Sequence, residues 1–95
     1  GGIKVQAEEV EQKIEPIISK ISLSRYFIYG IPDDLLGQRI TLFMEGEEKK
    51  DLSLLIDQLK AVLTRYELPR DIVFIQRFIE TDNGKIQRKM TVESL

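Results

Sequence analysis

The segment Thr81-Asp82-Asn83-Gly84-Lys85-Ile86-Gln87-Arg88 contains the clearest turn signal of the sequence. Asn-Gly strongly favours a tight turn, because both residues can adopt positive φ at little cost. A turn here would place Lys85 at an exposed tip. A lysine ammonium on a loop can approach a phosphate or a carboxylate and withdraw again. The same tripeptide is also typical of an ordinary solvated hairpin turn, so the rest of the chain must decide between the two interpretations.

The composition is typical of one soluble globular domain. The chain has 95 residues, of which 42% are hydrophobic and 32% are charged, and a chain of this length forms one modest core. Its formal net charge is −2, whereas nonspecific binding to nucleic acid or to an anionic membrane requires a net basic surface. We therefore expect no nucleic-acid partner and no membrane partner.

The missing residue types exclude several kinds of site. The sequence contains no cysteine and no histidine. It can therefore form no disulfide, no thiolate or imidazole metal site, and no serine or cysteine triad of the usual kind. We expect no metal site on this chain. Without a membrane-length apolar run or a visible signal peptide, a cytoplasmic location is the default expectation.

Hydrophobic periodicity predicts strands and helices in the first half of the chain. Residues 3–5 alternate like a short strand, and residues 7–20 form an amphipathic helical pattern that Pro16 is expected to kink or break. Residues 25–29 are rich in β-formers and predict a buried strand. We expect the Gly30-Ile31-Pro32-Asp33-Asp34 segment to close this strand and to form a turn, with a short helical turn ending at Gly37 as one option.

The second half of the chain also contains strand and helix patterns. Residues 40–44 alternate like a strand with at least one buried face, and residues 46–50 form a charged loop. Residues 51–66 predict the clearest helix, with Asp51 as its N-cap and Pro69 beyond its end.

The fold class follows from the last elements. Residues 72–75 are apolar at every position and predict a strand covered on both sides, and residues 89–95 suit a final short helix. The expected fold is α+β, a small, mainly three-stranded sheet with two packed helices and a C-terminal hairpin turn that carries Lys85. The strand order stays open.

Three separated stretches together match the pattern of one superfamily. Gly2 precedes the triplet Glu9-Val10-Glu11 by seven residues, and the turn at residues 30–34 is followed by Gly37. The chain closes with Thr-x-x-Gly-Lys-apolar-x-Arg at residues 81–88, with Pro69 ahead of the preceding strand. In this order the stretches resemble the C-terminal domain of the adenylate-forming enzymes, which include acyl-CoA synthetases, nonribosomal peptide adenylation domains and luciferases.

The resemblance implies a domain organisation. Residues 1–95 would be the mobile lid domain of such an enzyme, with the N-terminal AMP-binding domain and the hinge absent from this chain. The opening Gly-Gly-Ile-Lys-Val-Gln looks most like the small-acid CoA ligases, particularly the o-succinylbenzoate-CoA ligases of menaquinone synthesis. Two departures stand out. Ala7 replaces a usual proline, and Phe78-Ile79-Glu80-Thr81 replaces Leu-Pro-Arg-Thr, which puts the local loop shape in doubt.

The resemblance also implies a chemistry. Such enzymes join a small carboxylic acid to ATP, giving an acyl-adenylate and pyrophosphate, and then transfer the acyl group to coenzyme A. They bind ATP, coenzyme A and Mg²⁺ mainly through the N-terminal domain. Lys85 would be the catalytic residue, a fixed cation that offsets the repulsion between the carboxylate and the α-phosphate. The turn that supports it consists of Thr81, Asn83 and Gly84.

Gly1 and Gly2 would lie on the coenzyme A side, where glycine lets the pantetheine arm approach the backbone. A simple turn is the alternative reading of these two glycines.

Other polar residues have simpler interpretations. Glu9 and Glu11 do not share a helix face, so roles at the helix start and in solvent are expected rather than a catalytic pair. Arg88 and Lys89 suit a charged helix face better than phosphate or domain-interface contacts. The aromatic residues of the first predicted strand are expected to be core or strand residues; they are Tyr26, Phe27 and Tyr29.

Two rival functions remain open. An adenylation domain that serves a carrier protein would share these motifs. A small α+β module that binds phosphate or RNA through Lys85, Arg88 and Lys89 is the other rival, which the net charge of −2 disfavours.

Overall fold

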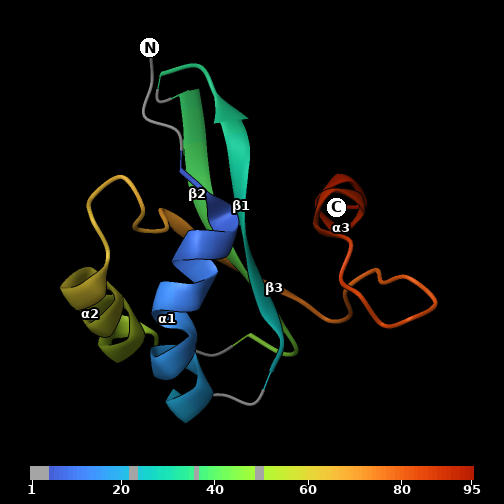
Figure 1. Cartoon of the computed structure of the whole chain (residues 1–95), viewed down its shortest axis with the longest axis horizontal. Coiled ribbons are helices and arrows are strands. Elements are labelled where there is room, and N and C mark those ends of the chain that lie inside the picture. Colours follow the sequence, from blue (N-terminus) through green and yellow to red (C-terminus); the bar gives the residue numbers. More distant parts are fainter. Residues whose placement is uncertain (1–4, 22–23, 36, 49–50) are drawn as a thin grey trace.

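A computed structural model describes residues 5–21, 24–35, 37–48 and 51–95. The described residues form three helices and three strands (Figure 1). In chain order they are α1 (Ala7–Ile21), β1 (Tyr26–Asp33), β2 (Gly37–Glu45), α2 (Ser53–Val62), β3 (Asp71–Ile75) and α3 (Arg88–Glu93). The predicted α+β class is therefore confirmed. The strand expected over residues 3–5 falls mostly outside the described residues, as do Gly1 and Gly2.

The sheet is mixed, with β2 in its centre. The strand order is β1-β2-β3; β1 pairs antiparallel with β2, and β3 pairs parallel with β2. Ile28 lies opposite Leu42, and Leu42 lies opposite Ile72. Antiparallel neighbours can be joined by a short hairpin, whereas the parallel pair needs a crossover, which α2 provides.

Alternation along the strands builds one core on each face of the sheet. Helices α1 and α2 cover one face, and α3 with its preceding loop lies on the other side (Figure 1). Leu42 and Ile28 belong to the first core, while Phe43 and Phe27 belong to the second. The prediction that β3 is covered on both sides holds only in part: its apolar residues pack alternately against the two cores, but each is only half-buried.

Helix α1 runs without interruption through Pro16, so the expected break does not occur. Proline removes one amide donor and leaves the carbonyl four residues earlier without its helical partner. Pro16 and Gln12 are both exposed, which lets water satisfy that carbonyl. The buried side of the helix, formed by Val10, Ile14 and Ile18, is unaffected.

Strand β1 continues through Gly30 and Pro32 to Asp33, so the expected end at Gly30 is wrong. The Ile28 amide points away from β2 and donates to the Glu11 carboxylate of α1. Because Pro32 follows Ile28 by four residues in the strand, its backbone nitrogen points in the same direction. Its missing N–H therefore faces the outer edge of the sheet and costs no ladder bond. The predicted turn is displaced to Asp34 and Leu35, so residues 31–33 belong to the strand.

Helix α2 is shorter than predicted at both ends. The N-cap position is Leu52 rather than Asp51, although the Asp51 carboxylate still accepts a hydrogen bond from the Ser53 amide at 3.0 Å. At the other end, Thr64 and Glu67 form a capping box: the Thr64 amide donates to the Glu67 carboxylate at 3.0 Å, and the Glu67 amide donates to the Thr64 hydroxyl at 3.3 Å. This new turn ends the helix before Pro69 is reached.

Replacement of the central core residue Leu42 should destabilise the whole chain. Leu42 is fully buried, so Leu42→Ala removes apolar contacts and leaves a cavity. We expect the free energy of unfolding to fall by about 2–5 kcal/mol, measured by urea denaturation. Leu54→Ala is the matched control, because Leu54 is 64% exposed and its loss should cost about 0.5 kcal/mol or less. Similar losses in both variants would contradict the assigned core.

Candidate functional site

Lys85 lies on an exposed hairpin loop, as the turn signal predicted. Glu80 and Ile86 form an isolated antiparallel bridge, and the Thr81 amide donates to the Lys85 carbonyl at 2.8 Å. The Gly84 amide donates to the Thr81 carbonyl at 2.9 Å, and Gly84 has a φ of 82°. Among the described residues only glycines have positive φ, so Asn83 does not adopt it. The loop is therefore of the three-residue type that ends in a left-handed glycine.

The side chain of Thr81 fixes the backbone at Lys85. Its Oγ1 accepts a hydrogen bond from the Lys85 amide at 3.1 Å. The Lys85 side chain is exposed, and in the part of the chain that the structure describes no carboxylate forms an ion pair with it. Its ammonium is therefore free to meet an anion supplied from outside this domain.

Both ends of the hairpin are attached to the second core. Phe78 is buried and meets the Phe27 ring edge-on, with ring centroids 4.9 Å apart. Thr91 of α3 is also buried; its hydroxyl accepts a hydrogen bond from the Ile79 amide at 3.0 Å and donates one to the Gln87 carbonyl at 2.7 Å. These contacts hold the base of the loop while its tip stays in solvent.

An ion pair between Glu11 and Arg88 joins α1 to α3. Glu11 Oε1 lies 2.6 Å from Arg88 Nη2, and Oε2 lies 3.1 Å from Nε. Glu11 Oε2 also accepts a hydrogen bond from the Ile28 amide on the outer edge of β1, at 2.8 Å. The hydrogen bond with Glu11 is the main cause that raises the pKa of Arg88 above its usual value. One carboxylate thus connects three elements.

This contact corrects two expectations. Glu11 has no solvent role, and Arg88 lies in a bidentate ion pair rather than on a free charged face. Glu9 is exposed as expected. The sequence held only a weak signal for the pairing, namely opposite charges in two motifs that are far apart along the chain. The acidic triplet and the last residue of the closing signature meet in space.

The aromatic residues of β1 are structural, as predicted. Phe27 is buried, and Tyr29 packs against the same core. The single hydroxyl proton of Tyr26 is shared between the Glu11 carbonyl, at 3.1 Å, and the Glu15 carboxylate. Burial, followed by the hydrogen bond with Glu15, raises the pKa of Tyr26 well above its usual range.

A polar groove lies beside the N-terminal end of the described chain. It is lined by residues of α1 and of the β1–β2 hairpin together with Arg88; they include Gln6, Glu8, Tyr29, Gly30 and Gln38. Gly30 permits this arrangement, because a Cβ atom there would lie 2.5 Å from the Gln38 side chain. Gly1 and Gly2 themselves lie outside the described residues, so their predicted contact with coenzyme A stays a prediction.

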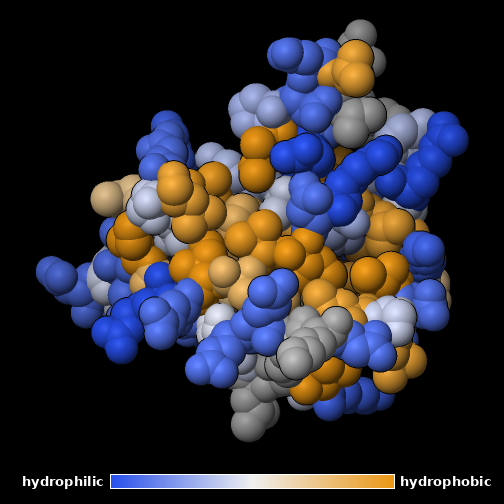
Figure 2. Space-filling view, turned by 180° about the vertical axis from the view of Figure 1, so that it is seen from behind, coloured by the Kyte–Doolittle hydropathy of each residue, from blue (hydrophilic) through white to orange (hydrophobic). Residues whose placement is uncertain are grey.

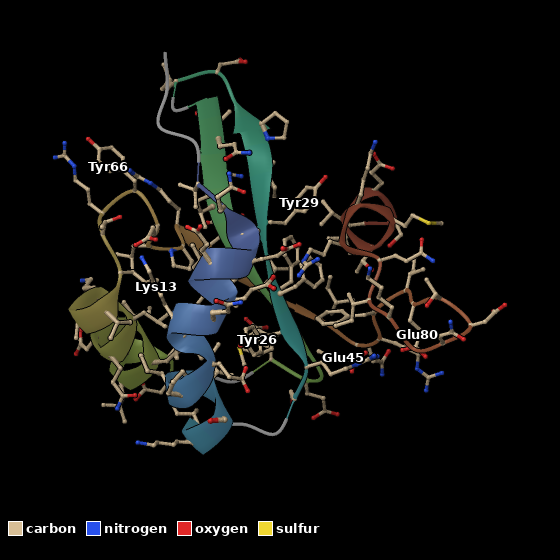
Figure 3. The ribbon with its side chains drawn as sticks, in the orientation of Figure 1. Lys13, Tyr26, Tyr29, Glu45, Tyr66 and Glu80 are labelled. Atoms are coloured by element: carbon tan, nitrogen blue, oxygen red, sulfur yellow. The ribbon has the colours of Figure 1, made fainter. Side chains whose placement is uncertain are left out.

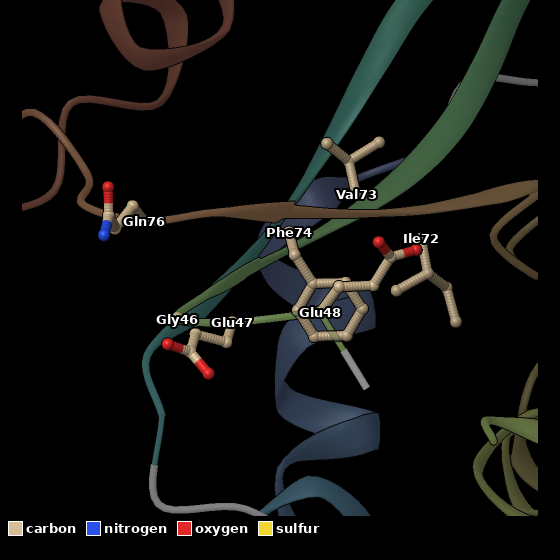
Figure 4. A pocket seen from close by; sticks show the side chains of 7 residues that line it. All are labelled: Gly46, Glu47, Glu48, Ile72, Val73, Phe74 and Gln76. Atoms are coloured by element: carbon tan, nitrogen blue, oxygen red, sulfur yellow. The ribbon is translucent and has the colours of Figure 1, made fainter. Parts of the chain in front are cut away.

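Two further hollows lie along β3. One is lined by Ile72, Val73 and Phe74 with Glu47 and Glu48 (Figure 4). The other lies between β3 and α2 and is largely apolar, and apolar side chains gather over the middle of the face opposite to the view of Figure 1 (Figure 2). Lys85 lines neither hollow. None of the described helices is both long and apolar enough to span a bilayer.

Comparison with known proteins identifies relatives among the CoA ligases. No family model matches the chain. It is 28% identical over 102 residues to the oxalate–CoA ligase of Saccharomyces cerevisiae, covering 99% of this chain and 19% of that protein. It is 31% identical over 94 residues to the human mitochondrial malonate–CoA ligase ACSF3, covering 97% of this chain and 16% of that protein. The chain thus spans less than a fifth of the length of these curated relatives.

Solved structures share the fold. An acyl-CoA synthetase (AMP-forming)/AMP-acid ligase II-like protein from Dyadobacter fermentans superposes with a TM-score of 0.88 at 26% identity, covering 99% of this chain and 27% of that chain. The o-succinylbenzoate coenzyme A synthetase of Bacillus subtilis superposes with a TM-score of 0.76 at 20% identity, covering 97% of this chain and 18% of that chain. The chain is homologous to acid-CoA ligases (AMP-forming) and corresponds to the C-terminal domain of the adenylate-forming superfamily.

The two carboxylates of the triplet should differ in their effect on stability. Glu11→Gln keeps the shape of the side chain but removes its charge, which weakens the hydrogen bonds with Arg88 and with the Ile28 amide. We expect the free energy of unfolding to fall by about 1–3 kcal/mol, measured by chemical denaturation. Glu9→Gln is the control and should change it by about 0.5 kcal/mol or less. An equal effect of the two substitutions would show that the ion pair does not stabilise the fold.

Proposed function

We propose that this chain is the lid domain of an acid-CoA ligase and that Lys85 takes part in the adenylation step. The observation that carries the proposal is the exposed ammonium of Lys85, unpaired among the described residues, on a loop whose base is packed against the sheet. The homology to acid-CoA ligases supports it. Residues 1–95 would then work together with an AMP-binding domain that precedes them in the whole protein.

Lys85 would act by charge rather than by proton transfer. A carboxylate must attack the α-phosphate of ATP, which brings two anions together and concentrates negative charge in the transition state. A lysine ammonium beside both groups offsets this repulsion. The hairpin can deliver that ammonium because the side chain extends from the loop into solvent instead of packing on its own domain.

The nucleotide and the metal would be held elsewhere. Among the described residues, no group of three or more Asp and Glu side chains lies close enough together to hold a metal ion. From the family resemblance, we assign the binding of ATP and Mg²⁺ mainly to the AMP-binding domain, and the approach of coenzyme A to the Gly1-Gly2 side of the lid after a domain rotation. Arg88 is not assigned to phosphate binding, because Glu11 occupies it.

The substrate class that we propose is a small carboxylic acid. The oxalate–CoA and malonate–CoA ligases act, by their names, on small acids. o-Succinylbenzoate, a precursor of menaquinone, stays a candidate because of the opening Gly-Gly-Ile-Lys-Val-Gln. We keep the cytoplasm as the proposed location, on the sequence alone; the name of the human relative places that relative in mitochondria.

Removal of the Lys85 charge should separate the two half-reactions. In the intact ligase, Lys85→Ala should slow acyl-adenylate formation by about 10²–10³-fold, measured by ATP–pyrophosphate exchange. Thioester formation from a preformed adenylate should change far less, because the lid has rotated by then. Lys89→Ala removes a neighbouring exposed lysine and should leave both steps unchanged. Equal loss of both half-reactions in Lys85→Ala would count against the role of Lys85.

The acyl acceptor can be tested with the same enzyme. If coenzyme A is the acceptor, its titration into the intact ligase should give a saturable yield of acyl-CoA, detected by mass spectrometry. An enzyme that forms the adenylate but no acyl-CoA, and instead loads a carrier protein, would support the carrier-serving alternative. Binding of RNA by this chain that weakens steeply with added salt would instead favour the RNA-binding module.

A further inference from the structure

The arginine just before β1 lies at the centre of a charged network beside the Lys85 hairpin. Arg25 Nε lies 2.9 Å from Glu45 Oε1, and its Nη2 lies 2.8 Å from Glu45 Oε2. Its Nη1 lies 2.6 Å from Glu80 Oε2. Arg25 also lies near the ring of Phe78, with Cζ 5.9 Å from the centroid. The network joins the start of β1, the end of β2 and the segment that leads into the hairpin.

The contact with Glu45 fixes the direction of the guanidinium. A planar guanidinium that meets a carboxylate through two parallel hydrogen bonds has its plane determined by them. Glu45 is itself held, because its Oε2 accepts a hydrogen bond from the Phe78 amide at 2.8 Å. The hydrogen bond with Arg25 is the main cause that lowers the pKa of Glu45. The remaining guanidinium nitrogen, Nη1, therefore points in a defined direction.

Arg25 Nη1 forms an ion pair with Glu80, the first residue of the hairpin. Glu45 and Glu80 lie near each other below α3 (Figure 3). Glu80 forms the bridge with Ile86, and its neighbour Thr81 holds the Lys85 amide. The Glu80 side chain is 44% exposed, and Arg25 is its ion-pair partner, so it adds little to the core. Its contact restrains the hairpin rather than the sheet.

We propose that Arg25 and Glu80 are positioning residues for Lys85, a charged tether that fixes the orientation in which the hairpin presents the ammonium. The inference rests on the proposed function of Lys85 for its catalytic consequence, although the tether itself does not depend on that function. The pair is largely exposed, and exposed pairs change an equilibrium by about two- to fivefold. The tether therefore shifts the equilibrium constant between the correctly oriented hairpin and its other orientations by this factor.

Hydrogen exchange in this chain tests the tether directly. Glu80→Gln removes the charge of the contact with Nη1 and so weakens it, but leaves the Arg25–Glu45 pair in place. The amides of Thr81, Gly84 and Lys85 should then exchange about two- to fivefold faster, while exchange of the Ile28 amide stays unchanged and the melting temperature falls by only a few degrees. Asp82→Asn is the matched control, because it removes an equal charge from the same loop and should not change exchange. Unchanged exchange in Glu80→Gln, or equal acceleration in both variants, would overturn the tether.

Kinetics of the intact ligase test whether the tether acts through Lys85. Glu80→Gln should lower kcat for adenylation, by at most about fivefold, and leave KM for the acid unchanged. In a Lys85→Ala background the same substitution should cause no further loss, because the group that it positions is gone. A full additional loss in that background would overturn the positioning role. If Lys85→Ala itself leaves adenylation unchanged, the proposed function fails, while the exchange result still decides whether the tether exists.

Discussion

The burial of β2 on both faces is the constraint on which this domain depends. Residues 40–44 are all buried, and successive side chains of a strand point to opposite sides of the sheet. Both faces of the sheet must therefore be covered by other elements of the chain. Helices α1 and α2 cover one face, and the segment after β3 covers the other with Phe78 and α3. The Lys85 loop is thus an extension of the second core rather than a loose appendage.

The Glu11 carboxylate binds an edge-strand amide and also joins two helices. Strand β1 lies at the edge of the sheet, and edge strands expose backbone groups that invite unwanted pairing. Glu11 accepts the outward amide of Ile28 and at the same time holds Arg88 of α3. Two of the motifs behind the family resemblance therefore meet in a structural contact, while Lys85 of the closing motif stays exposed. This division separates residues that build the lid from the residue proposed to serve catalysis.

The sequence predicted the elements well where the cause is local. The periodicity of α1, the alternation of β2 and the turn before Lys85 depend on near neighbours, and the structure contains all three. Errors occurred where a partner distant in sequence decides. Whether Pro32 interrupts β1 depends on which edge of the strand it faces, and the partner of Glu11 is set by tertiary packing. The early end of α2 was readable in principle, because Thr64 and Glu67 have the spacing of a capping box.

The contact between Glu11 and Arg88 also constrains the order of folding. The two residues are 77 positions apart, and the parallel pairing of β2 and β3 needs the whole α2 crossover. Contacts of such long sequence separation form slowly, because the loops between them must close first. During synthesis α1 leaves the ribosome well before α3, so the contact between Glu11 and Arg88 can form only after most of the chain has been made. The second core, which holds the base of the Lys85 loop, likewise needs Phe78 and cannot be complete before that residue has been synthesised.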